Sequence, residues 1–281
     1  MKKILVPTDF SKAAATATDV AFDIAKKSGA SIVLLHVIDQ ALGGSFNVEG
    51  QVGSGDMTTK LFNLQQIKRA KAQLTKVVND PRYAAVKVDG ELRMGNPYHG
   101  MVTIIGENKV DLVVMGTAGK TGKSNMLIGS NTEKVIRSSR CPVLTVTSKP
   151  ATTNFKNIVY ATSMSKGEEL FARIVKRTQA IYNSTIHIVR VNTPGDFQRD
   201  YIVKGYMNDF AKKLGFKNYT LNIFNDLTVE EGVIRFSDSI DADLITMATH
   251  GRSGFAHVIA GSVAEEVANH SKRPILTFVV K

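Results

Sequence analysis

KKILVPTDFSKA, residues 2–13, combines a short apolar run, a polar turn and the start of a helical pattern. The stretch KNIVYATSMSKG at 156–167 aligns with it at an offset of 154 residues. The apolar run Ile4–Val6 is typical of a buried strand, and the alanine-rich stretch after the turn has helical spacing. The chain therefore begins with a strand, a turn and a helix, and it repeats that unit.

Two further matches extend the repeat. IVLLHV at 32–37 aligns with IHIVRV at the same offset, whereas VDLVVMGTAGKTG, from residue 110, aligns with ADLITMATHGRSG at an offset of 132. The second copy is thus shorter where the first carries the glycine-rich insert QALGGSFNVEGQVGSGD at 40–56. A boundary in the polar stretch SKPATTNFK predicts two domains, 1–149 and 150–281.

Short β-branched runs alternate with helical stretches in each copy, as in a parallel sheet wrapped by crossover helices. Either Asp9 or Ser11 can cap the first helix, and Ser165 and Glu168 have capping-box spacing in the second copy. The predicted fold is α/β, with two tandem doubly wound, Rossmann-like domains that each hold a five-stranded parallel sheet flanked by helices. The strands expected in copy one are Ile4–Pro7, Ile32–Ile38, Val86–Leu92, Leu112–Gly116 and Val143–Thr147.

Composition excludes several classes of protein. The single cysteine, Cys141, rules out an internal disulfide framework, and it precedes a buried strand, which favours packing over catalysis. The histidines lack metal-ligand spacing, so no metal site is predicted. No apolar run approaches the roughly 18 residues that span a bilayer. We expect a soluble, cytoplasmic protein.

The formal charge of +11 raises the question of a nucleic-acid partner. Residues 1–150 hold 20 Lys and Arg against 12 Asp and Glu, and much of the excess lies in KRAKAQLTK at 68–76. These charges recur at helical spacing without interleaved aromatic residues, so a solvated helix face is the simpler interpretation. We predict no nucleic-acid partner.

MGTAGKTGKS at 115–124 has the composition of a phosphate loop, but the P-loop motif requires glycine where the chain has Thr117. The actual spacing is Gly116, two residues, Gly119, nine residues, and then Gly129 with a serine that opens a helix. Glycines let backbone N–H groups approach phosphate oxygens, and a helix N-terminus favours an anion. Ligands of this fold bind beyond the carboxyl ends of the strands, so we expect this loop and the Asp9 turn to line one cleft.

These motifs resemble the universal stress protein family, in its nucleotide-binding branch with tandem domains. PTDFS, LLHVID, VVMGTAGKTG, IGSNTEKVI and CPVLTV stand in the order of that family. The resemblance implies ATP as the ligand, accompanied by Mg or Mn, with the Asp9 carboxylate on the ribose. The nucleotide-binding residues that it implies are Pro7, Thr8, Asp9, Val37, Met115, Gly116, Thr117, Gly119, Lys120, Thr121, Gly122, Gly129, Ser130, Asn131 and Thr132.

The second copy departs from this pattern. Ala161, Ser163 and Ala248 replace the proline, the aspartate and the first glycine of copy one, which removes the ribose acceptor and crowds the backbone. The second-copy candidates that keep their places are Gly251, Gly261 and Ser262. Family members pair two such domains through their last strands, so the resemblance also implies an internal pseudo-dimer, with association of chains into a homodimer left open.

Three functions remain open at this point. The first is a nucleotide-dependent stress-response regulator without catalytic residues, because no metal-holding carboxylate or nucleophile–base set stands out. The second is a slow ATPase or an autophosphorylating protein, with Ser130 or Thr121 as acceptors. The third is an interaction or small-lipid-binding module that uses the glycine-rich insert.

Overall fold

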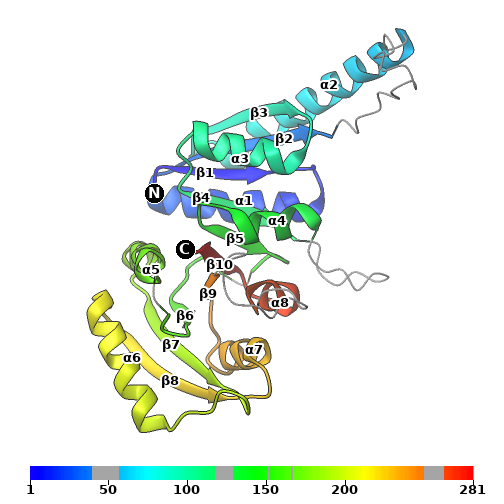
Figure 1. The fold of residues 1–281 in the computed structure, drawn as a ribbon. Coiled ribbons are helices and arrows are strands. Elements are labelled where there is room, and N and C mark those ends of the chain that lie inside the picture. Colours follow the sequence, from blue (N-terminus) through cyan, green and yellow to red (C-terminus); the bar gives the residue numbers. More distant parts are fainter. Residues whose placement is uncertain (40–56, 118–128, 151, 166, 250–262, 281) are drawn as a thin grey trace, which may run out of the picture. The chain divides into compact units, whose positions relative to one another are not determined.

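The computed structural model describes residues 1–39, 57–117, 129–150, 152–165, 167–249 and 263–280. The chain divides into two compact units, Met1–Asp111 and Leu112–Lys281. Figure 1 shows the strands and helices of the chain, coloured along the sequence. The two units are groups of residues that contact one another closely, and they do not coincide with the two copies of the sequence repeat, because β4 and β5 of the first copy belong to the second unit. The boundary between the two copies at 149/150 stays a prediction.

Unit 1 contains parallel strands in the order β3-β2-β1 with helices packed on them. The apolar centre of β1 is fully buried, whereas β3 lies at the sheet edge and keeps mostly part-exposed residues. The third strand begins two residues later than predicted, because the chain first makes a 3-10 turn, η1. The elements of unit 1 are β1 (Lys3–Pro7), α1 (Lys12–Ser28), β2 (Ser31–Ile38), α2 (Met57–Val78), η1 (Pro81–Tyr83), β3 (Val88–Met94) and α3 (Pro97–Glu107).

Unit 2 has the strand order β4-β5-β10-β9-β6-β7-β8, and its paired strands are parallel except at β5–β10. This alternation of strands and helices confirms the predicted α/β class. The elements are β4 (Leu112–Gly116), α4 (Ser130–Ser138), β5 (Val143–Val146), β6 (Asn157–Ala161), α5 (Glu169–Tyr182), β7 (Thr185–Asn192), α6 (Asp200–Leu214), β8 (Tyr219–Asn225), α7 (Val229–Ser239), β9 (Leu244–Thr249), α8 (Val263–His270) and β10 (Ile275–Val279). None of the described helices combines the length and the apolar character that crossing a membrane requires.

The repeat is visible in matching hydrogen bonds. The Asp111 carboxylate accepts from the backbone N–H groups of residues 2 and 3, at 2.6 and 3.2 Å. Asp243, which is 132 residues further on, accepts from residues 156 and 157, both at 2.8 Å. Each aspartate thus ties the chain before the fourth strand of its copy to the start of the first.

The last strands of the two copies pair antiparallel about a local two-fold axis. Leu144 faces Leu276, which is its own equivalent at the offset of 132. On either side, the Thr145 hydroxyl donates to the carbonyl of residue 275, and the Thr277 hydroxyl donates to that of residue 143, both at 3.4 Å. The predicted pairing through the last strands is therefore confirmed.

Arg137 links helices α4 and α8 beside this strand pair. Its Nε and Nη2 donate to the two carboxylate oxygens of Glu265 at 3.0 and 2.7 Å, and Nη2 also donates to Glu133 at 2.9 Å. The Glu265 side chain is 4% exposed, whereas that of Glu133 is 43% exposed. Because Glu133 and Glu265 are repeat equivalents, one guanidinium binds the same position of both copies.

We expect Glu265→Gln to lower the free energy of unfolding by about 1.5–3 kcal/mol, since it removes the charge from a buried, doubly hydrogen-bonded pair. Glu133→Gln is the matched control and should cost about 0.3–0.5 kcal/mol, the usual worth of an exposed pair four residues apart on a helix. Urea unfolding of both variants measures the difference. Equal losses would contradict the assigned bridge.

Glycines allow the helices that follow the third strands to pack closely. A Cβ placed on Gly232 of α7 would lie 2.5 Å from a methyl carbon of Val191 on β7. The equivalent Gly100 of α3 lies against Val37 in the same way, with a distance of 2.9 Å. Both copies therefore use the same glycine–valine contact, which no local sequence signal indicated.

Gly232→Ala is expected to destabilise the protein by about 1–3 kcal/mol through overpacking. Gly205→Ala in α6 is the control, because its added Cβ meets nothing within 4 Å and a better helix former should stabilise by about 0.5–1 kcal/mol. Adding Val191→Ala should recover part of the Gly232→Ala loss in a double-mutant cycle. Strictly additive effects in that cycle would refute the close contact.

Candidate functional site

A tight turn follows β1 at residues 8–11. The backbone N–H of Phe10 donates to the Thr8 hydroxyl at 3.0 Å, and Phe10 has φ of 64°, a left-handed conformation that bulky residues rarely adopt. The equivalent Met164 has φ of 60° and donates to the Thr162 hydroxyl at 2.8 Å. The fold thus builds the same turn in both copies.

Asp9 is exposed in this turn, directly after the end of β1. Its Oδ1 accepts from the backbone N–H of Ser11 at 2.9 Å. The Ser11 hydroxyl oxygen in turn accepts from the N–H of Ala14 at 3.2 Å. Of the two predicted caps, Ser11 is therefore the cap of α1, and Asp9 presents its carboxylate to solvent.

His36 holds the turn from the neighbouring strand. Its Nδ1 lies 2.7 Å from the Thr8 carbonyl oxygen, which can only accept, so Nδ1 carries the proton of this bond. The His36 and Phe10 ring centroids are 4.5 Å apart. The sequence placed His36 in β2 without a role, because nothing in its local pattern indicates a partner 28 residues away.

The remaining first-half candidates lie close by in unit 1. Pro7 ends β1 and is partly exposed. Thr8 follows it, and its N–H donates to the Leu35 carbonyl at 2.8 Å. Val37 is partly exposed on β2, and its methyl groups pack against α3. Thr8, Asp9 and Val37 therefore belong to one local structure at the carboxyl ends of β1 and β2.

The end of β4 supplies the next candidates. Met115 is buried, Gly116 is partly exposed, and Thr117 is only 2% exposed. The Thr117 hydroxyl donates to that of Thr147 at 3.0 Å, so it is used inside the protein. Of these three residues, Gly116 is the most accessible to a ligand.

Helix α4 begins at a glycine. Gly129 is its N-cap residue, with φ of −65° and ψ of 145°, and no side chain among the described residues caps the helix at this position. A Cβ on Gly129 would meet nothing within 4 Å. Ser130 is exposed, Asn131 is partly exposed and Thr132 is buried. Neither the backbone conformation nor the packing requires glycine here. The absence of a side chain would let a ligand approach the backbone closely.

Several candidates lie outside the described residues. In copy one these are Gly119, Lys120, Thr121 and Gly122, and in copy two they are Gly251, Gly261 and Ser262. The predicted cleft between the Asp9 turn and the glycine loop stays a prediction.

In copy two a carboxylate occupies the inside of the equivalent turn. Glu168 is 1% exposed, and its Oε2 accepts from the hydroxyls of Tyr160 and Thr162 at 2.7 and 2.8 Å. Its Oε1 accepts from the backbone N–H and the hydroxyl of Ser165 at 3.0 and 2.9 Å. Burial and the nearby Glu168 carboxylate raise the pKa of the Tyr160 hydroxyl, which therefore stays protonated as a donor.

The predicted capping box at Ser165 and Glu168 is wrong as a helix start. Its backward bond from Glu168 to the Ser165 N–H is present, but α5 begins only at Glu169. In copy one, Ser11 caps α1 and the helix begins at Lys12. The inward Glu168 carboxylate binds donors from β6 as well, so the chain turns into the helix three residues later than in copy one.

No cluster of three His, Cys, Asp or Glu side chains suited to a metal ion occurs among the described residues. The Asp9 turn instead offers a hydroxyl and an exposed carboxylate, and the first turn of α4 offers N–H groups, hydroxyls and the Glu133 carboxylate that pairs with Arg137. N–H groups at a helix start are suited to an anion, and a carboxylate is suited to a hydroxyl donor.

The sequence profile of the universal stress protein family matches residues 1–147 and 226–278. The chain belongs to this family. Universal stress protein Slr1230 of Synechocystis is 27% identical over an alignment of 292 positions, gaps included. The alignment covers 99% of this chain and 100% of that protein.

Solved structures confirm the fold of this universal stress protein. One from Archaeoglobus fulgidus superposes with a TM-score of 0.77 at 19% identity, covering 99% of this chain and 98% of that one. Another universal stress protein, in complex with cAMP, has 22% identity and a TM-score of 0.38 over 45% of this chain. The second likeness is too weak to assign a ligand here.

Proposed function

We propose that this universal stress protein binds ATP through its first copy and acts as a nucleotide-dependent regulator of the stress response. The observation that carries the proposal is the start of α4, where no described side chain caps the helix and Gly129 is a glycine that the local backbone conformation and packing do not require. The first N–H groups of a helix have no intrahelical acceptor, and the positive end of the dipole favours phosphate. A methyl group at this position would keep phosphate oxygens away from those groups.

The Asp9 turn supports the adenosine half of the proposal. The carboxylate is exposed and oriented through its bond to the Ser11 N–H, so it can accept from a ribose hydroxyl without a change in the turn. His36 and Phe10 hold the backbone of the turn in place. Such preorganisation lowers the entropy lost on binding.

Mg²⁺ or Mn²⁺ enters this proposal as part of the ligand. Mg²⁺ keeps several waters and binds substrate phosphates together with few carboxylates, so a protein cage of acidic residues is unnecessary. The chain's contribution is to bind the triphosphate through amides and hydroxyls. In this proposal the ATP-loaded protein and the empty protein differ in the surface that they present to a partner, and this difference is the basis of regulation.

We expect Gly129→Ala to weaken ATP binding by roughly 10- to 100-fold, the worth of one or two hydrogen bonds to a charged acceptor. The melting temperature should fall only slightly, because the added Cβ meets open space and alanine is a somewhat poorer N-cap than glycine. Gly106→Ala, in equally open space on α3, is the control that should leave affinity intact while it stabilises the helix by about 0.5–1 kcal/mol. Calorimetric titration with ATP and magnesium measures the effect, and unchanged affinity of Gly129→Ala would exclude phosphate at α4.

Asp9→Asn should also weaken ATP binding, by roughly tenfold or more. The amide oxygen carries no negative charge, so it accepts a weaker hydrogen bond from a ribose hydroxyl than the carboxylate does. The asparagine oxygen can still accept from the Ser11 N–H, so the turn should persist. Ser163→Ala at the equivalent position of copy two should change nothing, and titration should give one nucleotide per chain, since Glu168 already occupies the donors of that turn. Two equal sites per chain would overturn the assignment to copy one.

A further inference from the structure

The charged side chains of helix α2 are all positive. Its 22 residues include Lys60, Lys68, Arg69, Lys71 and Lys76 and not a single aspartate or glutamate. Most surface helices mix both signs, which limits their attraction to other charged bodies. The net positive charge of α2 therefore attracts anionic groups.

The lysines gather on the face of α2 that points away from the sheet. Ala70 and Leu74 are buried, and Leu74 approaches Gly90 of β3, so that side of the helix belongs to the core. Lys68, Lys71 and Lys76 recur at helical spacing on the other side and are exposed. They line a shallow hollow of about 820 Å³ that also includes Ala72, Thr75, Asn79, Asp80 and Pro81.

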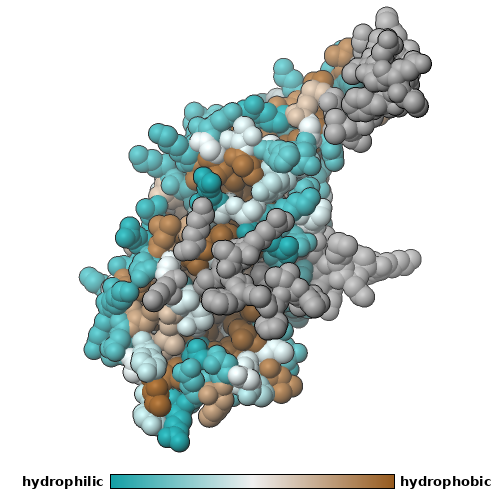
Figure 2. All heavy atoms as spheres, viewed as in Figure 1, coloured by the Kyte–Doolittle hydropathy of each residue, from teal (hydrophilic) through white to brown (hydrophobic). Residues whose placement is uncertain are grey.

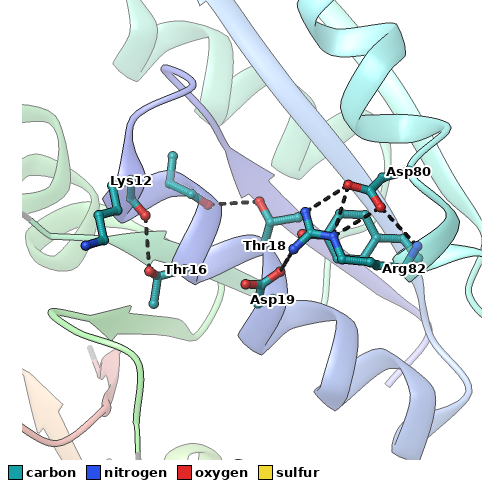
Figure 3. Close-up of polar contacts among 8 residues, drawn as sticks. Lys12, Thr16, Thr18, Asp19, Asp80 and Arg82 are labelled. Carbon is teal, nitrogen blue, oxygen red and sulfur yellow. Dashed lines mark hydrogen bonds and ion pairs between the residues drawn. The ribbon is translucent and has the colours of Figure 1, made fainter.

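The one carboxylate in this hollow is already neutralised. Asp80 accepts from Nε and Nη2 of Arg82, with a closest approach of 2.8 Å, and Arg82 also pairs with Asp19 of α1 at 3.6 Å (Figure 3). The hydrogen bonds from Arg82 lower the pKa of Asp80, which keeps the carboxylate ionised and bound to that guanidinium. No ion pair among the described residues involves the three lysines of the hollow.

The same outward face becomes apolar toward the start of α2. Leu61 and Leu64 precede Lys68 by seven and four residues, which places all three on one side of the helix. Leu61, Phe62 and Leu64 are 55%, 58% and 54% exposed. Figure 2 shows apolar side chains among hydrophilic ones along α2. At 1.5 Å per residue, the stripe from Leu61 to Lys76 is roughly 22 Å long.

We propose that the outward face of α2 docks on an anionic lipid surface. Leu61, Phe62 and Leu64 insert among the lipid headgroups, and Lys68, Lys71 and Lys76 bind lipid phosphates. Insertion of exposed apolar side chains combined with a basic stretch is the pattern of interfacial helices. A nucleic acid would use the lysines but leave the exposed leucines without a partner, so the observations favour a lipid surface.

The test is co-sedimentation of the full chain with vesicles of equal parts phosphatidylglycerol and phosphatidylcholine, compared with pure phosphatidylcholine. We expect binding to the anionic vesicles alone, weakened by added salt. The triple variant Lys68→Gln, Lys71→Gln, Lys76→Gln should bind roughly 100-fold more weakly, since each lysine near such a surface is worth about a fivefold change.

The matched control changes the same number of charges on copy two. Lys204, Lys212 and Lys217 are exposed in or just after α6, the copy-two counterpart of α2, and their change to glutamine should leave vesicle binding nearly unaltered. Equal losses in the two triple variants would mean that only net charge matters, which overturns the proposal.

The apolar contribution has its own pair of variants. Leu61→Ser with Leu64→Ser should weaken vesicle binding by roughly tenfold or more, whereas Leu170→Ser with Leu227→Ser, which are 52% and 73% exposed in copy two, should not. Competition by free glycerol phosphate would identify a soluble phosphate ligand instead. Absence of binding to anionic vesicles, or binding to a DNA duplex that the lysine triple variant abolishes while vesicles are ignored, would likewise refute the lipid assignment.

Discussion

The antiparallel pair of β5 and β10 is the constraint on which the two-copy architecture depends. A final strand in a doubly wound domain leaves one edge unpaired, and such an edge is an aggregation hazard. Here Leu144 opposite Leu276 lets each copy cover the edge of the other, and the threonine hydroxyls on either side repeat the contact. Strands β4 and β5 consequently pack with the second copy in one compact unit.

Once this pairing holds the copies together, their sites are free to differ. The Thr117 hydroxyl in copy one has Thr147 as its partner, but the equivalent Thr249 faces Val279, and its buried hydroxyl finds no partner among the described residues. Arg137 binds Glu265 across the pair, while the position equivalent to Arg137 is Asn269. Such exchanges preserve the fold and change polar groups at the end of the fourth strand and on the last helix of each copy. Copy two has therefore kept the architecture with different polar groups at these positions.

The sequence predicted those features that depend on neighbours along the chain. Alternation of apolar and polar stretches located β4 at Leu112–Gly116, and the offsets revealed the repeat. It did not predict contacts between distant segments, such as His36 with Thr8 or Gly232 with Val191. The prediction for Glu168 was wrong as a helix start. Capping-box spacing indicates the local pair with Ser165, but it does not indicate the hydroxyls at and just after the end of β6 that also donate to this carboxylate.

The candidate site shows the same division between local and distant causes. Spacing and resemblance selected Asp9 and Gly129, and both have the exposure or open space that a ligand needs. Whether Asp9 or Ser11 capped α1 could not be decided locally, because both lie within one turn of the helix start and both are good caps. The hydrogen bond from the Ala14 N–H to the Ser11 hydroxyl oxygen settled it in favour of Ser11.

Strain in that turn is a property of the fold rather than a sign of nucleotide binding. A left-handed residue costs about 1 kcal/mol or more, and strained residues often mark functional sites. Yet Phe10 and Met164 share this conformation although only copy one has the carboxylate beside it. The turn must therefore serve the connection from strand to helix in both copies. The residue beside the left-handed one differs, with Asp9 in the first copy and Ser163 in the second, so the two copies vary a side chain on a backbone that folding already requires.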